Sequence, residues 1–104
     1  LVLDPPFRLT VNTEGASPAL SAAVANELRA QYRGYGALAG LLGRLRPLVL
    51  GADLARERRR DIFRALAEDK SLPALMAEGR YGEVRGLVEG HLAPVRLPGD
   101  FSIP

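Results

Sequence analysis

The change from extended chain to helix occurs in a stretch that reads VNTEGASPAL, residues 11–20. Before it, residues 7–12 alternate apolar and polar side chains, which is the period of a half-buried strand. After it, Ser17 is placed to cap a helix and Pro18 to occupy the first helical position. We therefore predict one β-strand over residues 7–12, followed by helices. The sequence offers this strand no second strand, so we expect it to pair with a partner subunit or with another domain.

Apolar residues that recur every three or four positions predict about five short helices within residues 17–92. The first has Leu20, Val24 and Leu28 on one face and ends near residues 31–33. The others are expected over residues 38–49, 54–68, 72–78 and 81–92, with Asp53 and Ser71 as caps and with Pro47 kinking the second helix or ending it near Arg46. Pro94, Pro98 and Pro104 predict an irregular tail, residues 93–104. The fold class is mainly α, in a single domain over residues 1–104.

Composition narrows the classes of function. The chain has 104 residues and a formal net charge of +2, too small to favour nucleic acid as a partner. It has no cysteine, which excludes thiolate metal sites and cysteine nucleophiles, and no run of about 18 apolar residues that would predict a membrane span. We expect a cytoplasmic protein. The chain begins at Leu1 on an apolar run, which we interpret as a cut within a longer protein.

Small polar residues surround the start of the first predicted helix. Free N–H groups and the helix dipole favour an anion at such a position, and Asn12, Thr13 and Ser17 could add hydrogen bonds to a carboxylate or phosphate. The same residues also fit an ordinary capped helix, and the charge of Glu14 would repel an anion. Both interpretations remain open on physical grounds.

Three further features carry weaker signals. The run RERRRD at residues 56–61 is either a solvated helix face or a cationic wall for a polycarboxylate or an acidic partner. His91 is the single histidine and could be a ligand or a proton carrier, but no Cys, Asp or Glu stands at ligand spacing from it, which makes the case for a metal site weak. Tyr32 and Tyr35 are expected to pack where two helices meet.

The segment around the first helix resembles siroheme synthases and stand-alone precorrin-2 dehydrogenases just after their nucleotide-binding domain. In that family a strand is followed by Ser/Thr-Thr/Ser-Gly-Gly-x-Ser-Pro and an Ala-rich helix. The matching residues here are Thr13, Gly15, Ser17, Pro18 and Leu20, whereas Asn12 and Glu14 depart from the pattern.

A second part of the pattern follows about forty residues later. The family has a Glu-Arg-Arg-Arg run followed by an aromatic residue, and residues 57–60 with Phe63 are similar. The resemblance covers most of residues 5–92. It identifies the chain as similar to the carboxy-terminal dimerisation and tetrapyrrole-cleft part of that family.

The resemblance implies a concrete function. The full-length parent would oxidise precorrin-2 to sirohydrochlorin with NAD, and some family members also insert Fe²⁺ as a substrate. This part would supply homodimerisation and one wall of the tetrapyrrole cleft, whereas the NAD-binding Rossmann domain, the general base and the cofactor site are absent from it. The fragment alone is therefore expected to be inactive, with no catalytic residue of its own.

The implied substrate-binding residues are Ser17, Thr13 and Gly15, to which we add Asn12, Arg58 and Arg59 because the tetrapyrrole carries many carboxylates. The alternative hypothesis is a non-catalytic helical interaction module, regulatory or associated with nucleic acid, that uses the arginines at residues 58–60.

Overall fold

The computed structural model describes residues 2–4 and 7–103. This part of the chain is mainly helical. It contains, in order, β1 (Val2–Asp4), β2 (Phe7–Arg8), α1 (Pro18–Gln31), α2 (Tyr35–Gly51), α3 (Arg56–Glu68), α4 (Ser71–Ala77) and α5 (Tyr81–Leu92). Pro104, at the end of the predicted tail, lies outside the described residues, as do Leu1, Pro5 and Pro6.

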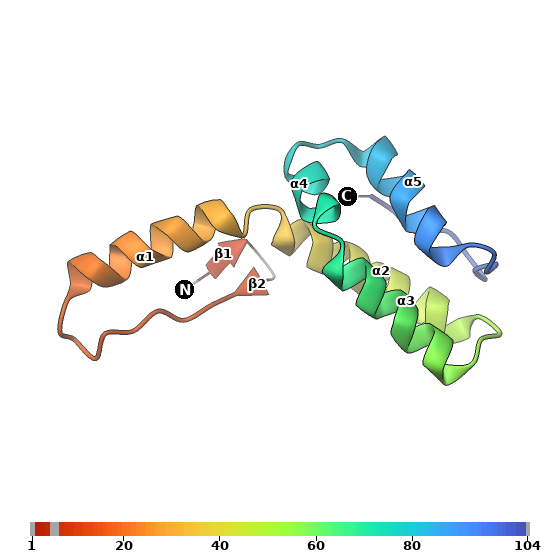
Figure 1. The fold of residues 1–104 in the computed structure, drawn as a ribbon, viewed down its shortest axis with the longest axis horizontal. Helices are drawn as coiled ribbons and strands as arrows, with labels where there is room; N and C mark the ends of the chain where they lie inside the picture. The colour runs from red at the N-terminus through yellow and green to blue at the C-terminus, as the bar shows by residue number, and fades with distance from the viewer. Residues whose placement is uncertain (1, 5–6, 104) are drawn as a thin grey trace.

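The molecule is elongated, with an arm and a body (Figure 1). The arm comprises β1, β2, the segment 9–17 and α1, and the body comprises α2 to α5 with the segment 93–103. The principal extents are 52 × 28 × 18 Å and the radius of gyration is 16.4 Å. A compact chain of this length would have a radius of gyration of about 13 Å. α1 therefore projects from the body, whereas β1 and β2 lie at the base of the arm, where β1 contacts both α1 and α2 and β2 contacts α2.

The predicted strand over residues 7–12 is not shown. Only Phe7–Arg8 adopt strand geometry, antiparallel to β1 of the same chain, and residues 9–12 have no regular structure. The alternating pattern nevertheless has a physical basis. Leu9 and Val11 are half-buried while Thr10 and Asn12 are exposed, and Val11 lines a hollow with residues of α1. Val11 therefore packs against α1, and half-buried and exposed side chains alternate over residues 9–12 with the same period as in a sheet.

The body encloses the hydrophobic core. Its buried side chains come from all four helices: Leu38, Leu41, Leu45 and Val49 from α2, Ile62 and Leu66 from α3, Leu72 and Met76 from α4, and Val84, Val88 and Leu92 from α5. The predicted apolar faces of these helices therefore converge. Each fully buried Leu, Val or Ile contributes about 1.5–3 kcal/mol relative to exposure, so the body holds most of the folding free energy.

Two predicted helix caps are wrong, and one of the two alternatives for Pro47 is excluded. α2 does not end near Arg46 but continues through Pro47 to Gly51, with Val49 buried near its end. Asp53 does not cap α3, whose first residue is Arg56. Neither does Ser71 cap α4. It is the first residue of that helix, and its backbone N–H donates to the Asp69 carboxylate.

The arm and the body meet at Gly34, between α1 and α2. Its φ is +87°, and a Cβ at this position would lie 2.0 Å from the carbonyl oxygen of Pro73 in α4. Only glycine combines a left-handed backbone with so close an approach. Tyr32 and Tyr35 flank it with their rings 5.0 Å apart in an edge-to-face contact, as expected of a helix junction. The direction in which α1 leaves the body is set here.

The segment 93–103 has no regular structure, as predicted, but it is firmly attached to the body. Phe101 is buried in the core, and the Arg85 guanidinium lies 4.5 Å from the centroid of its ring. Arg85 also donates to the Phe101 carbonyl and to the Asp100 carboxylate, and Arg44 donates to the Ser102 carbonyl. We call this segment the strap.

Candidate functional site

The turn at the tip of the arm has a left-handed backbone. Thr13 O accepts a hydrogen bond from Ala16 N at 3.0 Å, and the two residues between them have φ values of 55° for Glu14 and 81° for Gly15. The Asn12 side-chain oxygen accepts from Glu14 N at 2.6 Å. A left-handed glutamate stores strain, of about 1–3 kcal/mol, that the surrounding contacts must offset. The predicted site residues in this turn are thus held in one defined conformation.

Three hydroxyl groups connect this turn to α1. Thr13 Oγ1 accepts from Ser17 N at 3.1 Å and lies 3.1 Å from Ser21 Oγ, while Ser17 Oγ accepts from Leu20 N at 3.2 Å. Ser17 is therefore the predicted helix cap. The backbone N–H groups of Ser17 and Leu20, at the helix start where free N–H groups were expected to favour an anion, therefore already donate to side-chain oxygens of the turn. Within the described residues, the Ala19 amide remains without a partner, and the Ser17 hydroxyl keeps its proton for donation.

The two predicted arginines lie on α3, in the body, and not beside the turn (Figure 1). Arg58 Nη2 donates to Ala93 O at 3.3 Å, and Arg59 Nη2 donates to Ala52 O at 3.4 Å. Arg59 Nε is buried and has no hydrogen-bond partner among the described residues. Both side chains therefore bind backbone carbonyls that follow other helices of the body, Ala93 after α5 and Ala52 after α2. A single chain therefore brings Asn12, Thr13, Gly15 and Ser17 together but leaves the two arginines apart from them.

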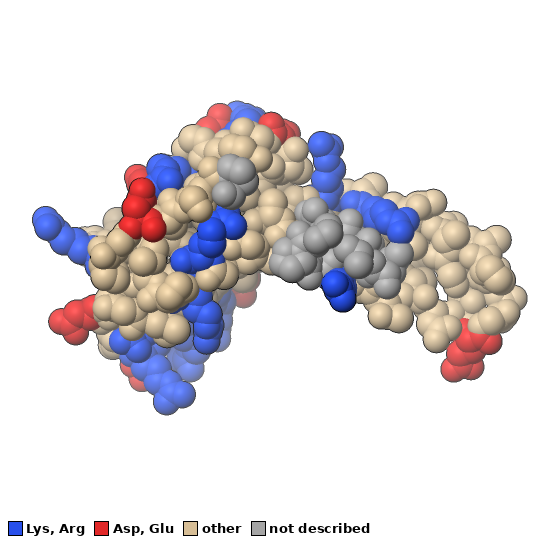
Figure 2. All heavy atoms as spheres, turned by 180° about the vertical axis from the view of Figure 1, so that it is seen from behind, with Lys and Arg blue, Asp and Glu red and all other residues tan. Residues whose placement is uncertain are grey.

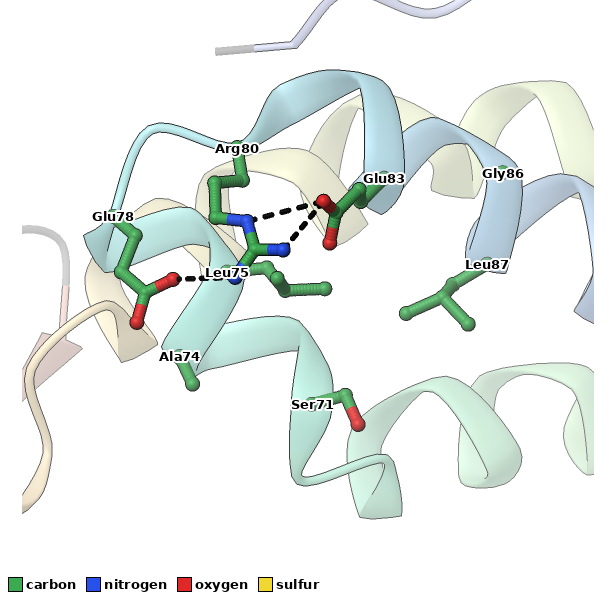
Figure 3. Close-up of a pocket in the computed structure, with 8 residues that line it drawn as sticks. All are labelled: Ser71, Ala74, Leu75, Glu78, Arg80, Glu83, Gly86 and Leu87. Atoms are coloured by element: carbon green, nitrogen blue, oxygen red, sulfur yellow. Dashed lines mark hydrogen bonds and ion pairs between the residues drawn. The ribbon is translucent and has the colours of Figure 1, made fainter.

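A groove of about 630 Å³ lies between α4 and α5 (Figure 3), and no sequence motif indicated it. Ala74, Leu75, Gly86 and Leu87 form its apolar part. At one end Arg80 is bound by Glu83 and Glu78, the second at 3.1 Å. Glu83 first and Glu78 second raise the pKa of Arg80 above its usual value. Arg80 is thus paired with both carboxylates, and this charged cluster lies at one end of a groove whose remaining lining is mostly apolar.

His91 forms a contact that its isolated position in the sequence did not suggest. His91 Nε2 lies 2.9 Å from the Asp69 carboxylate, and both side chains are mostly buried. The hydrogen bond from His91 is the main factor that lowers the pKa of Asp69, and the backbone N–H of Ser71 adds to it. The pair joins α5 to the start of α4. Nothing in the described part of the chain gathers three or more metal-ligating side chains.

None of the helices in residues 7–103 has both the length and the apolar character needed to cross a bilayer. A scan against protein-family models, a search of curated proteins and a search of solved structures each found no match to this chain.

Proposed function

We propose that this chain is the dimerisation and tetrapyrrole-cleft part of a siroheme-biosynthesis enzyme of the precorrin-2 dehydrogenase type. The observation that carries the proposal is the uncovered apolar face of the arm. Leu20 is 55% exposed, and Val24 and Leu28, which share its face, are only half-buried, while Ala25 is the one buried residue of α1. Such a face on a projecting helix is suited to burial against a second subunit.

The turn at the tip of the arm supports the cleft assignment. It combines a left-handed backbone, a serine hydroxyl that can still donate and an exposed Asn12 amide, all at the far end of the arm from the body (Figure 1). In a homodimer the arm could present this turn to the partner subunit. A tetrapyrrole carboxylate would accept hydrogen bonds from the Ser17 hydroxyl and the Ala19 amide. NAD and the proton-transferring groups would belong to the Rossmann domain of the full-length parent, and Fe²⁺ would be a substrate in chelatase members.

Dimerisation is tested by sedimentation velocity over a range of concentrations. We expect a dimer for the unmodified chain and a monomer for Leu20→Asp/Val24→Asp. The matched control is Leu50→Asp, which places a charge on the body, where Leu50 is 46% exposed, and should leave the dimer intact. Circular dichroism confirms that each variant is folded. A compact monomer of the unmodified chain at high concentration would refute the proposal.

The cleft assignment is tested in the full-length protein by NAD-dependent conversion of precorrin-2. Ser17→Asn keeps an oxygen that can cap α1 but removes the hydroxyl, whereas Ser17→Ala removes both. We expect both variants to lose tetrapyrrole affinity, and only Ser17→Ala to lose stability, by about 1 kcal/mol. Unchanged affinity and turnover in Ser17→Asn would remove Ser17 from the site.

A further inference from the structure

Three arginines on α3 form a row that the proposed function does not use. Arg56, Arg60 and Arg64 are four residues apart, so consecutive members lie on neighbouring turns, separated by about 6 Å along the helix axis. All three side chains are exposed. Figure 2 shows Lys and Arg side chains gathered over the end of the molecule where α2 and α3 lie. We call these residues the arginine row.

The arginine row has no partners within the described residues. None of its members takes part in a hydrogen bond or ion pair there, whereas Arg58, Arg59, Arg80 and Arg85 all do. Arg56 and Arg60 also line a hollow of about 320 Å³ together with Glu57. Three guanidinium groups with unused donors therefore face solvent from one helix.

We propose that the arginine row docks an acidic helix of a partner protein, one that carries carboxylates a single turn apart. Two helices share the same repeat, so carboxylates at positions i, i+4 and i+8 of the partner can each meet one arginine. Guanidinium groups bind carboxylates with two parallel hydrogen bonds, which gives the contact a defined register.

The charges beside the row distinguish this partner from a nucleic acid. Glu57 and Asp61 are also exposed and follow the arginine row on the next ridge of α3. A nucleic acid has a continuous line of phosphates, which these carboxylates would repel, and the net charge of the whole chain is only +2. A helix with separate carboxylates can meet the arginines and avoid the acidic ridge.

The probe is a fluorescent, alanine-based helical peptide with glutamates at i, i+4 and i+8, and its binding is followed by anisotropy at low and at physiological salt. We expect Arg56→Gln/Arg60→Gln/Arg64→Gln to weaken binding about tenfold, because exposed ion pairs are individually weak. The control is Arg29→Gln/Arg33→Gln/Arg96→Gln, which removes the same charge from exposed positions elsewhere and should change binding less than twofold. Circular dichroism confirms that both triple variants are folded.

Three outcomes would overturn the proposal. The first is no binding of the peptide by the unmodified chain. The second is equal loss in both triple variants, or equal binding of an isomeric peptide with glutamates five residues apart, since net charge alone would then explain the effect. The third is tighter, row-dependent binding of a single-stranded oligonucleotide, which would make nucleic acid the partner. The arginine row lies on the body and Leu20 on the arm, so this test and the dimerisation test can fail independently.

Discussion

Replacing Gly34 by alanine should be among the most damaging single substitutions in this chain. The new Cβ would stand 2.0 Å from the Pro73 carbonyl oxygen and 2.9 Å from its carbonyl carbon, and both are backbone atoms that cannot rotate away. The left-handed backbone, with φ at +87°, adds about 1–2 kcal/mol for any residue with a side chain. Overpacking of this kind adds about 1–3 kcal/mol. We expect a total loss of about 2–5 kcal/mol, against the roughly 5–15 kcal/mol that holds a domain folded.

Gly15→Ala is the matched control for this substitution. Gly15 has nearly the same φ, +81°, but nothing within 4 Å of its Cβ position. It should therefore lose only the left-handed backbone contribution, and the difference between the two variants isolates the clash with Pro73. Urea denaturation followed by circular dichroism measures both free energies of unfolding. Equal losses in the two variants would mean that α4 does not press on the junction and would refute the reasoning.

The remaining predictions also concern stability. Asp69→Asn should flatten the acid limb of the stability curve, measured by thermal melts from pH 2 to 7. The pKa of Asp69 is lowered in the folded state, so its contribution is present at neutral pH and is lost as the pH falls through that lowered value, below about 4. Phe101→Ala should destabilise the body by about 3–5 kcal/mol in urea, because a buried ring is lost. Pro47→Ala should raise the urea midpoint, because an exposed position inside α2 regains a backbone donor, and an unchanged midpoint would contradict this.

Helix positions were predictable where local signals agreed. The Ser17 cap and the following Pro18 predicted the start of α1, and α5 occupies residues 81–92 as its apolar spacing indicated. The exceptions depended on tertiary contacts. The predicted choice between a kink and an end at Pro47 is decided by a helix that continues to buried Val49, and the alternating pattern that predicted a strand coincides with packing of Val11 on α1. Neither contact can be derived from residues adjacent in sequence.

The candidate site shows the same division. The hydrogen bond that Ser17 accepts as a helix cap could be predicted from its position just before Pro18. The bonds that Arg58 and Arg59 donate to backbone carbonyls could not be predicted from the charged run alone. The sequence nevertheless contains a spacing that indicates these contacts of Arg58 and Arg59. Ile62 follows Arg58 by four residues and Arg59 by three, so both arginines stand beside the buried face of α3 and can reach backbone carbonyls there. The same spacing rule leaves the arginine row on the exposed side.

The burial of Phe101 has a consequence for synthesis of the chain on the ribosome. The core that begins at Leu38 is completed by a side chain 63 residues later, on the strap. At about 5–20 residues per second, translation of that interval takes about 3–13 s. During that time α2 to α5 are synthesised one after another. Their apolar faces cannot all be covered until Phe101 has been added, so a chaperone that binds exposed leucine and valine would find its substrate on the nascent chain before the strap emerges.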